Sequence, residues 1–151
     1  MNGVRAALYV DFDNVFSGLL KLDPAAAMAF VDDPASWLQR LSTSLTVDGP
    51  RSWRVLRCYL NSAGSVADPR GGEERLLFSG LRSSFLRAGF EVVDCPSFFS
   101  GSKNAADIRI VLDAMDALHG PTPYDEFVIA SADADFPRCW CGCGRPTGAP
   151  R

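Results

Sequence analysis

Residues 126–136 read EFVIASADADF, and this stretch decides which fold the rest of the chain can adopt. Its run of apolar and small residues, rich in Val and Ile, is typical of a strand buried on both faces of a parallel sheet. Two carboxylates, Asp133 and Asp135, follow where that strand ends. Because residues just past the carboxyl end of a strand line the ligand crevice of an open α/β sheet, the stretch predicts an acidic site. A polar loop with an Asp turn remains the alternative.

A second apolar run ends in the same way. Residues 6–12 read AALYVDF, and Asp11, Asp13 and Asn14 gather at the end of this run. Two strands that deliver acids to one edge favour a site for a hard cation, since Mg²⁺ and Mn²⁺ prefer oxygen ligands.

The remaining patterns predict strands alternating with helices. Helices are expected after residue 14, ending at Asp23-Pro24, from residue 34 to about 45, over residues 73–88 and over residues 105–118, with strands over 53–60 and 90–93. Residues 62–72 and 97–104 are expected to be loops. This alternation predicts an α/β domain with a parallel, doubly wound sheet of at least four strands.

The helix expected over residues 105–118 bears on the site. Asp107 lies in its first turn, where the helix dipole favours a carboxylate, and at the border of an apolar stripe, so it is expected to face a cleft. Asp113 and Asp116 are expected to be surface acids. The stripe consists of Ile108, Val111, Leu112, Met115 and Leu118.

Composition limits the class of protein. The 151 residues suffice for one domain with its own core, and the net charge of −3 with a pI near 5.0 argues against a broadly basic nucleic-acid binder. No apolar run approaches the roughly 18 residues of a membrane span, and the N-terminus lacks the pattern of a signal peptide. We therefore expect a cytoplasmic protein.

Four carboxylates are expected to share one crevice, because each lies at a strand end or at a helix N-terminus. Crowded carboxylates repel one another and need a cation to stay ionised together. One or two Mg²⁺ or Mn²⁺ ions would meet that need and would activate water for attack on a phosphodiester. The four are Asp11, Asp107, Asp133 and Asp135.

Three further residues are candidates for supporting roles. Asn14 is expected to hold a carboxylate or the attacking water by hydrogen bonding. Lys103 and Arg109 are expected to meet the phosphate backbone of a nucleic acid, although Lys103 also fits a solvated loop charge.

Other enzyme classes fit the sequence less well. No Gly-rich phosphate loop of a common pattern is present, and Ser131 lacks the context of a nucleophile elbow. A phosphatase-like or receiver-like acidic pocket stays open, because such proteins also place aspartates at strand ends.

Three motifs in order, DFDN at 11–14, KNAADI at 103–108 with DAMD at 113–116, and SADADF at 131–136, resemble those of NYN domains in the PIN-like nuclease superfamily. The resemblance spans residues 6–136 and implies a three-layer α/β/α fold with a mostly parallel sheet. It also implies a metal-dependent ribonuclease, with RNA as partner and Mg²⁺ or Mn²⁺ as cofactor. The metal-binding acids would be Asp11, Asp107, Asp133 and Asp135, with Asn14 as their polar helper.

Two further expectations follow from this resemblance. An RNA-binding module that is non-catalytic, or that a truncation has inactivated, is the main alternative to a nuclease. Because the low pI disfavours strong nonspecific binding to RNA, a homo-oligomer or a recruiting protein is expected to help bring in the substrate.

The sequence divides into a domain over residues 1–136 and an irregular tail over residues 137–151, PRCWCGCGRPTGAPR. Its three cysteines at alternate positions do not match common zinc sites. Residues 138–145 can be encoded CGG TGC TGG TGC GGC TGC GGG CGC, and a frame starting at the third base gives VLVRLRA, an amphipathic helix. We therefore hypothesise a frameshift that truncates the fold after residue 136.

Overall fold

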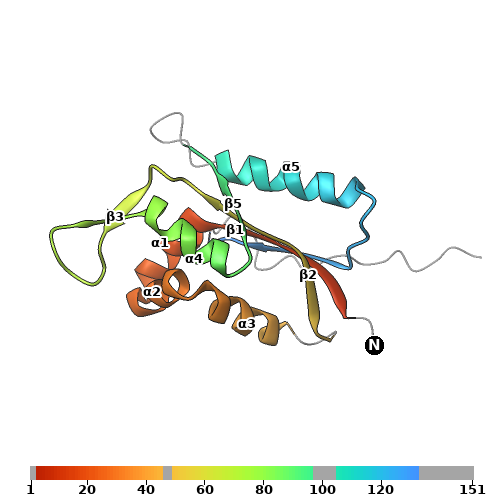
Figure 1. The fold of residues 1–151 in the computed structure, drawn as a ribbon, viewed down its shortest axis with the longest axis horizontal. Coiled ribbons are helices and arrows are strands. Elements are labelled where there is room, and N and C mark those ends of the chain that lie inside the picture. Colours follow the sequence, from red (N-terminus) through yellow and green to blue (C-terminus); the bar gives the residue numbers. More distant parts are fainter. Residues whose placement is uncertain (1–2, 46–48, 97–104, 133–151) are drawn as a thin grey trace, which may run out of the picture.

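A four-stranded parallel sheet forms the centre of the computed structural model, which describes residues 3–45, 49–96 and 105–132. Its strands are β1 (Val4–Asp11), β2 (Arg51–Leu60), β5 (Glu91–Asp94) and β6 (Glu126–Ala130), in the order β5-β2-β1-β6 (Figure 1). β1 is therefore bordered on both sides. The predicted parallel α/β fold is confirmed.

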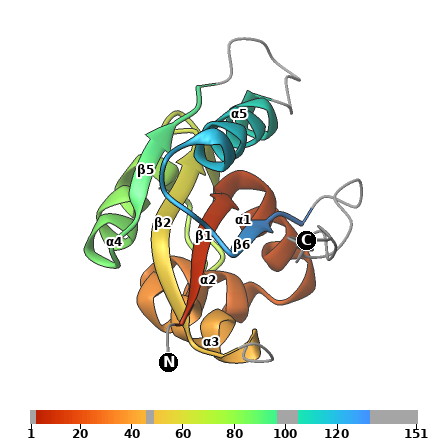
Figure 2. The same ribbon diagram turned by 90° about the vertical axis from the view of Figure 1, so that its right-hand side faces the viewer.

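Helices cover both faces of the sheet in unequal layers. On one face lie α1 (Phe12–Leu22), α2 (Pro24–Asp32), α3 (Pro34–Ser44) and α4 (Arg82–Arg87), whereas α5 (Ala105–His119) lies on the other (Figures 1 and 2). The strand order reverses after β5, so a right-handed connection to β6 must return across the opposite face. This arrangement agrees with the expected three-layer α/β/α fold. Within the described residues, no helix is long and apolar enough to cross a membrane.

The expected end of the first helix is also the start of a helix that the sequence patterns did not predict. The Asp23 side chain accepts hydrogen bonds from the backbone N–H groups of Ala25 and Ala26, at 3.0 and 3.2 Å. Pro24 takes the first position of α2, where its missing N–H costs nothing. One Asp-Pro pair therefore ends α1 and starts α2.

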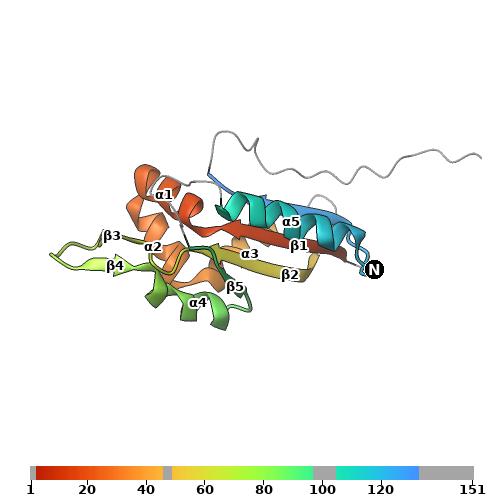
Figure 3. The same ribbon diagram turned by 90° about the horizontal axis from the view of Figure 1, so that it is seen from above.

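The single helix predicted over residues 73–88 is wrong. The structure forms β4 (Arg75–Leu77), the short 3₁₀ helix η2 (Phe78–Leu81) and then α4. The expected loop over residues 62–72 contains β3 (Ser65–Ala67), which pairs antiparallel with β4 and projects from the body (Figure 3). The Phe78 N–H donates to the Gly64 carbonyl at 3.0 Å, and the Phe78 ring is buried. This anchor breaks the helical pattern.

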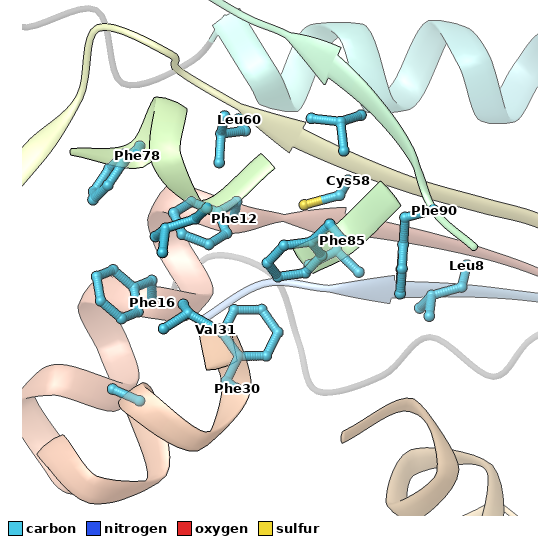
Figure 4. Close-up of a cluster of buried hydrophobic side chains, with 14 of the residues drawn as sticks. Leu8, Phe12, Phe16, Phe30, Val31, Cys58, Leu60, Phe78, Phe85 and Phe90 are labelled. Carbon is cyan, nitrogen blue, oxygen red and sulfur yellow. The ribbon is translucent and has the colours of Figure 1, made fainter. Parts of the chain in front are cut away.

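Phe12 is at the centre of an aromatic core between the sheet and the layer of helices α1–α4 (Figure 4). Its fully buried ring lies 5.1 to 6.0 Å, between centroids, from four other phenyl rings. Edge-to-face and offset pairs of this kind add stability beyond their buried area. The four rings belong to Phe16, Phe30, Phe78 and Phe85.

A buried ion pair holds the opposite end of the sheet. Arg51 on β2 and Glu126 on β6 face each other past β1, with side chains 3% and 9% exposed. Two hydrogen bonds of 2.9 and 3.0 Å join them in a bidentate arrangement. The pair fixes the amino ends of the two strands on either side of β1.

A buried carboxylate attaches α5 to the sheet. The Tyr59 hydroxyl donates to Asp113 Oδ2 at 2.7 Å, and the guanidinium groups of Arg57 and Arg109 lie 3.5 and 3.1 Å from the same carboxylate. Asp113 is only 9% exposed, so the expectation that it is a surface acid is wrong. It faces the sheet because polar side chains of β2 meet it there.

The expected orientation of the apolar stripe on α5 is also wrong. Its five large residues are 48–61% exposed, whereas Ile110 and Asp113 are buried against the sheet. The buried face of α5 contacts a smaller core cluster built on Ala7, Tyr9 and Tyr59. The stripe therefore points away from the sheet.

We expect Phe12→Ala to lower the free energy of unfolding by about 3–5 kcal/mol, because it opens a cavity among four rings. Phe12→Leu, which retains most of the volume, should cost clearly less. Urea unfolding followed by circular dichroism measures both variants. Equal small losses for the two variants would show that Phe12 does not organise the core.

We expect Asp113→Ala to cost about 2–4 kcal/mol, since it leaves the buried Tyr59 hydroxyl without its acceptor and removes the ion-pair partner of Arg109 and one of the two ion-pair partners of Arg57. Asp116→Ala, on an exposed position of the same helix, is the matched control and should change stability by less than about 0.5 kcal/mol. Hydrogen exchange should show faster opening of α5 in Asp113→Ala alone. Indistinguishable variants would contradict this account of how α5 is held.

Candidate active site

Asp11 marks the point where β1 becomes α1. Its side chain accepts a hydrogen bond from the Asn14 backbone N–H at 3.4 Å and so caps the amino end of α1. The residue is only 3% exposed. A carboxylate is favoured there by the helix dipole, but its burial needs further compensation.

Asn14 joins two strand ends. Its side-chain amide donates to Asp11 Oδ2 and contacts Ser131 Oγ, each at 3.3 Å. Ser131 directly follows β6, and Asp11 ends β1. The predicted role of Asn14 in holding a carboxylate agrees with this geometry.

The carboxyl groups of Asp11 and Asp107 meet. Burial, and a hydrogen bond with Asp107 that requires one of the two groups to be protonated, raise the pKa of Asp11 from its usual 3.8 to about 7. Hydrogen bonds from Asn14 offset part of that rise. Asp107 Oδ1 is buried, and no hydrogen-bond donor reaches it within the described residues. The structure therefore brings together Asp11 and Asp107, two of the four acids that were expected to share one crevice.

Asp13 is a third acid at the same edge, and it was not among the predicted metal ligands. Burial raises its pKa from 3.8 to about 6, although the backbone N–H of Asn61, just past β2, lowers it in part. Asp13 Oδ1 is buried and has no donor in the described part of the chain. Its position one residue past Phe12 places it here, and the DFDN motif is the sequence feature that identifies it.

Gly18 lets α1 lie close to the chain that leaves β6. A Cβ atom added at Gly18 would come 2.4 Å from Cβ of Ala132, which no real contact allows. The absence of a side chain at Gly18 therefore sets how closely the residues after β6 approach α1. No periodic pattern in the sequence singles out this glycine.

The other predicted site residues fall into two groups. Arg109 is not brought to the acids: its Nε bonds Asp113, and it lines a pocket of about 410 Å³ between α5 and the sheet. Two residues along a helix correspond to a rotation of about 200°, so Arg109 and Asp107 lie on opposite flanks of α5. Lys103, Asp133 and Asp135 lie outside the described residues, as does the tail over residues 137–151.

The acids at this edge offer the carboxylate oxygens that a divalent cation prefers as ligands. Asp13 and Asp107 each have a buried carboxylate oxygen without a donor, and Asp11 and Asp107 crowd together. Hard cations bind such oxygens and allow neighbouring carboxylates to ionise together. Within residues 3–45, 49–96 and 105–132, however, no three His, Cys, Asp or Glu side chains are arranged to hold a metal. A complete set of ligands would need further acids, such as the Asp133 and Asp135 predicted from the sequence.

The chain was compared with known protein families, with curated proteins and with solved structures. The family model described as the NYN domain matches residues 5–140. No curated protein and no solved structure gives a significant match. The matched range includes every candidate site residue, both those in the structure and those predicted from the sequence alone.

Without metal, we expect ionisation of Asp11 to destabilise the fold as pH rises. The folded state holds this proton up to a pKa of about 7, whereas the unfolded chain releases it near 4, so stability falls between these values. Asp11→Asn removes this dependence and should be more stable than the unsubstituted chain by about 2–4 kcal/mol at pH 8, but not at pH 4.

Urea unfolding at several pH values in the presence of a chelator measures the difference. Asp13 titrates in the same direction in both proteins, so subtracting one profile from the other isolates Asp11. Asp116→Asn is the control and should follow the unsubstituted chain. Parallel profiles for Asp11→Asn and the unsubstituted chain would rule out a raised pKa at Asp11.

Proposed function

We propose, because the chain belongs to the NYN domain family, that it is a ribonuclease that hydrolyses RNA phosphodiester bonds with Mg²⁺ or Mn²⁺. Membership of the family implies a nuclease-like function related to RNA, and PIN-like nucleases typically use divalent metals.

The contact between the Asp11 and Asp107 carboxyl groups carries the proposal. Burial and mutual repulsion raise the pKa of Asp11 to about 7, so the pair costs folding free energy when both groups are ionised. Perturbed acids of this kind cluster at functional sites. A bound cation would turn this destabilising pair into a binding site.

The residues have separate roles in the proposed reaction. Asp11 and Asp107, with the predicted Asp133 and Asp135, would hold the cation, which when bound supplies an activated water and stabilises charge on the phosphate. Asn14 fixes the Asp11 carboxylate and ties it to the end of β6. Asp13 joins the start of α1 to the end of β2 through the Asn61 N–H.

Two basic residues are assigned to substrate binding. Lys103 and Arg109 remain predicted contacts to RNA phosphates. The net charge of −3 gives little general attraction to a polyanion. A recruiting protein or an oligomer would therefore assist in a cytoplasmic setting.

We expect the purified chain with Mn²⁺ to cleave a single-stranded RNA, and Asp107→Asn to reduce the rate by at least about 100-fold. Asp116→Asn, an exposed acid on the same helix, should retain the rate. Thermal unfolding with and without Mn²⁺ provides the second readout: the cation should raise the melting temperature of the unsubstituted chain and of Asp116→Asn, but not that of Asp107→Asn.

Two results would refute the proposal. RNA binding that needs no metal and survives Asp107→Asn, with no cleavage, would make the chain a binding module. Release of phosphate from a small phosphate ester, without cleavage of RNA, would make it a phosphatase-like enzyme.

A further inference from the structure

The outer face of α5 carries a continuous apolar stripe with no covering element in the described part of the structure. Among the described residues of the whole chain, eight large apolar residues are exposed, and five of them lie on this helix, with exposed fractions of 48–61%. The other three, Leu22, Leu77 and Leu86, lie on separate elements. Single exposed apolar residues are normal on a protein surface, whereas a contiguous patch marks an interaction site.

The spacing of the stripe suits a helical partner. Ile108, Val111, Met115 and Leu118 follow one another at intervals of three, four and three residues, the a and d positions of a heptad, and Leu112 lies beside them. This is the period of a seam between two helices. Two heptads are too few for an independent coiled coil, but the sheet already holds α5 in its helical form, so pairing does not require it to fold.

The charges beside the stripe favour an antiparallel copy of the same helix. Arg109 and Asp116 lie on one flank, one toward each end of α5. A second α5 packed antiparallel, with its centre near Leu112, brings Arg109 of each copy toward Asp116 of the other. A parallel copy would instead bring opposite flanks together, so that Arg109 lies near Asp107 of the other copy and Asp116 has no cation beside it.

Other kinds of partner fit this surface less well. The stripe itself has no cation to meet a phosphate, which disfavours nucleic acid. An anionic membrane selects helices with several Lys or Arg residues beside the apolar face. Here the charged neighbours of the stripe are Asp107, Asp116 and the single Arg109.

We propose that α5 is a homodimerisation surface, on which two copies of this chain pair their apolar stripes antiparallel about a twofold axis near Leu112. At about 100 Å² of exposed apolar surface per residue, the stripe buries roughly 500 Å² per copy, or 1,000 Å² in total. This is at the small end for a specific interface, so the dimer is weak and reversible, with a dissociation constant on the order of 10 µM. The two acidic sites lie at opposite ends of the paired helices, because Asp107 is in the first turn of α5.

Sedimentation velocity of the full chain from 1 to 200 µM tests the proposal, without metal or RNA and therefore independently of catalysis. The unsubstituted chain should shift from monomer to dimer over this range. Leu112→Glu places two carboxylates together at the twofold axis and should weaken the dimer by at least 10-fold. Leu86→Glu, on α4 and 48% exposed, is the matched control and should dimerise like the unsubstituted chain.

A second variant tests the orientation. Asp116→Arg should weaken an antiparallel dimer, because it faces Arg109 of the other copy, and thermal unfolding at 1 µM should show that each variant stays folded. A chain that is monomeric at 200 µM would overturn the proposal and leave the stripe to a helix of another protein or to residues beyond 132. A dimer unaffected by Leu112→Glu would place the interface elsewhere and also overturn it.

Discussion

Burial of the Phe12 ring is the constraint on which the candidate site depends. β1 ends and α1 begins at this residue, and the ring is held among four other phenyl groups under the sheet. With Phe12 fixed inward, the residues on either side of it, Asp11 and Asp13, must lie at the edge of the sheet. Asp11 then caps α1 and Asp13 reaches the end of β2. The buried Phe12 ring of the DFDN motif therefore positions the carboxylates of Asp11 and Asp13. Because the core holds this ring firmly, the acids stay close together.

The second half of the site depends on a different interaction. Asp107 is in the first turn of α5, and α5 is held on the sheet by Asp113, which accepts the Tyr59 hydroxyl at 2.7 Å and lies against two arginines. Asp107 and Asp113, two of the three carboxylates of this helix, have opposite environments. Asp113 is fully compensated by donors and cations, so its burial stabilises the attachment of α5, whereas Asp107 lies against another acid. The buried Asp113 carboxylate thus holds α5 so that Asp107 lies in an energetically unfavourable position beside Asp11. Such a placement is typical of a functional site rather than of a structural one.

The sequence predicted those features that follow from local patterns. Apolar runs identified the four parallel strands, and acids at the ends of residues 6–12 and in the first turn of residues 105–118 predicted that Asp11 and Asp107 meet. Features set by distant partners were missed. The leucines at 76 and 77 suggested a helix, but the buried ring of Phe78 and its bond to Gly64 turn that segment into a strand and a 3₁₀ turn. The orientation of α5 was inverted because periodicity assumes an apolar partner, whereas β2 presents Arg57 and Tyr59 to the helix and so selects Asp113.

The two faces of the sheet therefore differ in what stabilises them, and the site lies where they meet. The α1–α4 face has the large aromatic cluster, whereas the α5 face has a small cluster supplemented by polar contacts. The free energy of local opening is lowest where few apolar contacts are buried, so we expect α5 to be the layer that detaches first from the sheet. Since Asp107 is part of that layer and Asp11 belongs to the core layer, the distance between the two acids depends on how firmly α5 is held. A cation that bridges the acids and a partner that covers the outer stripe of α5 would both favour the closed arrangement. Binding at one place would then strengthen binding at the other, because both ligands stabilise the same state of one helix.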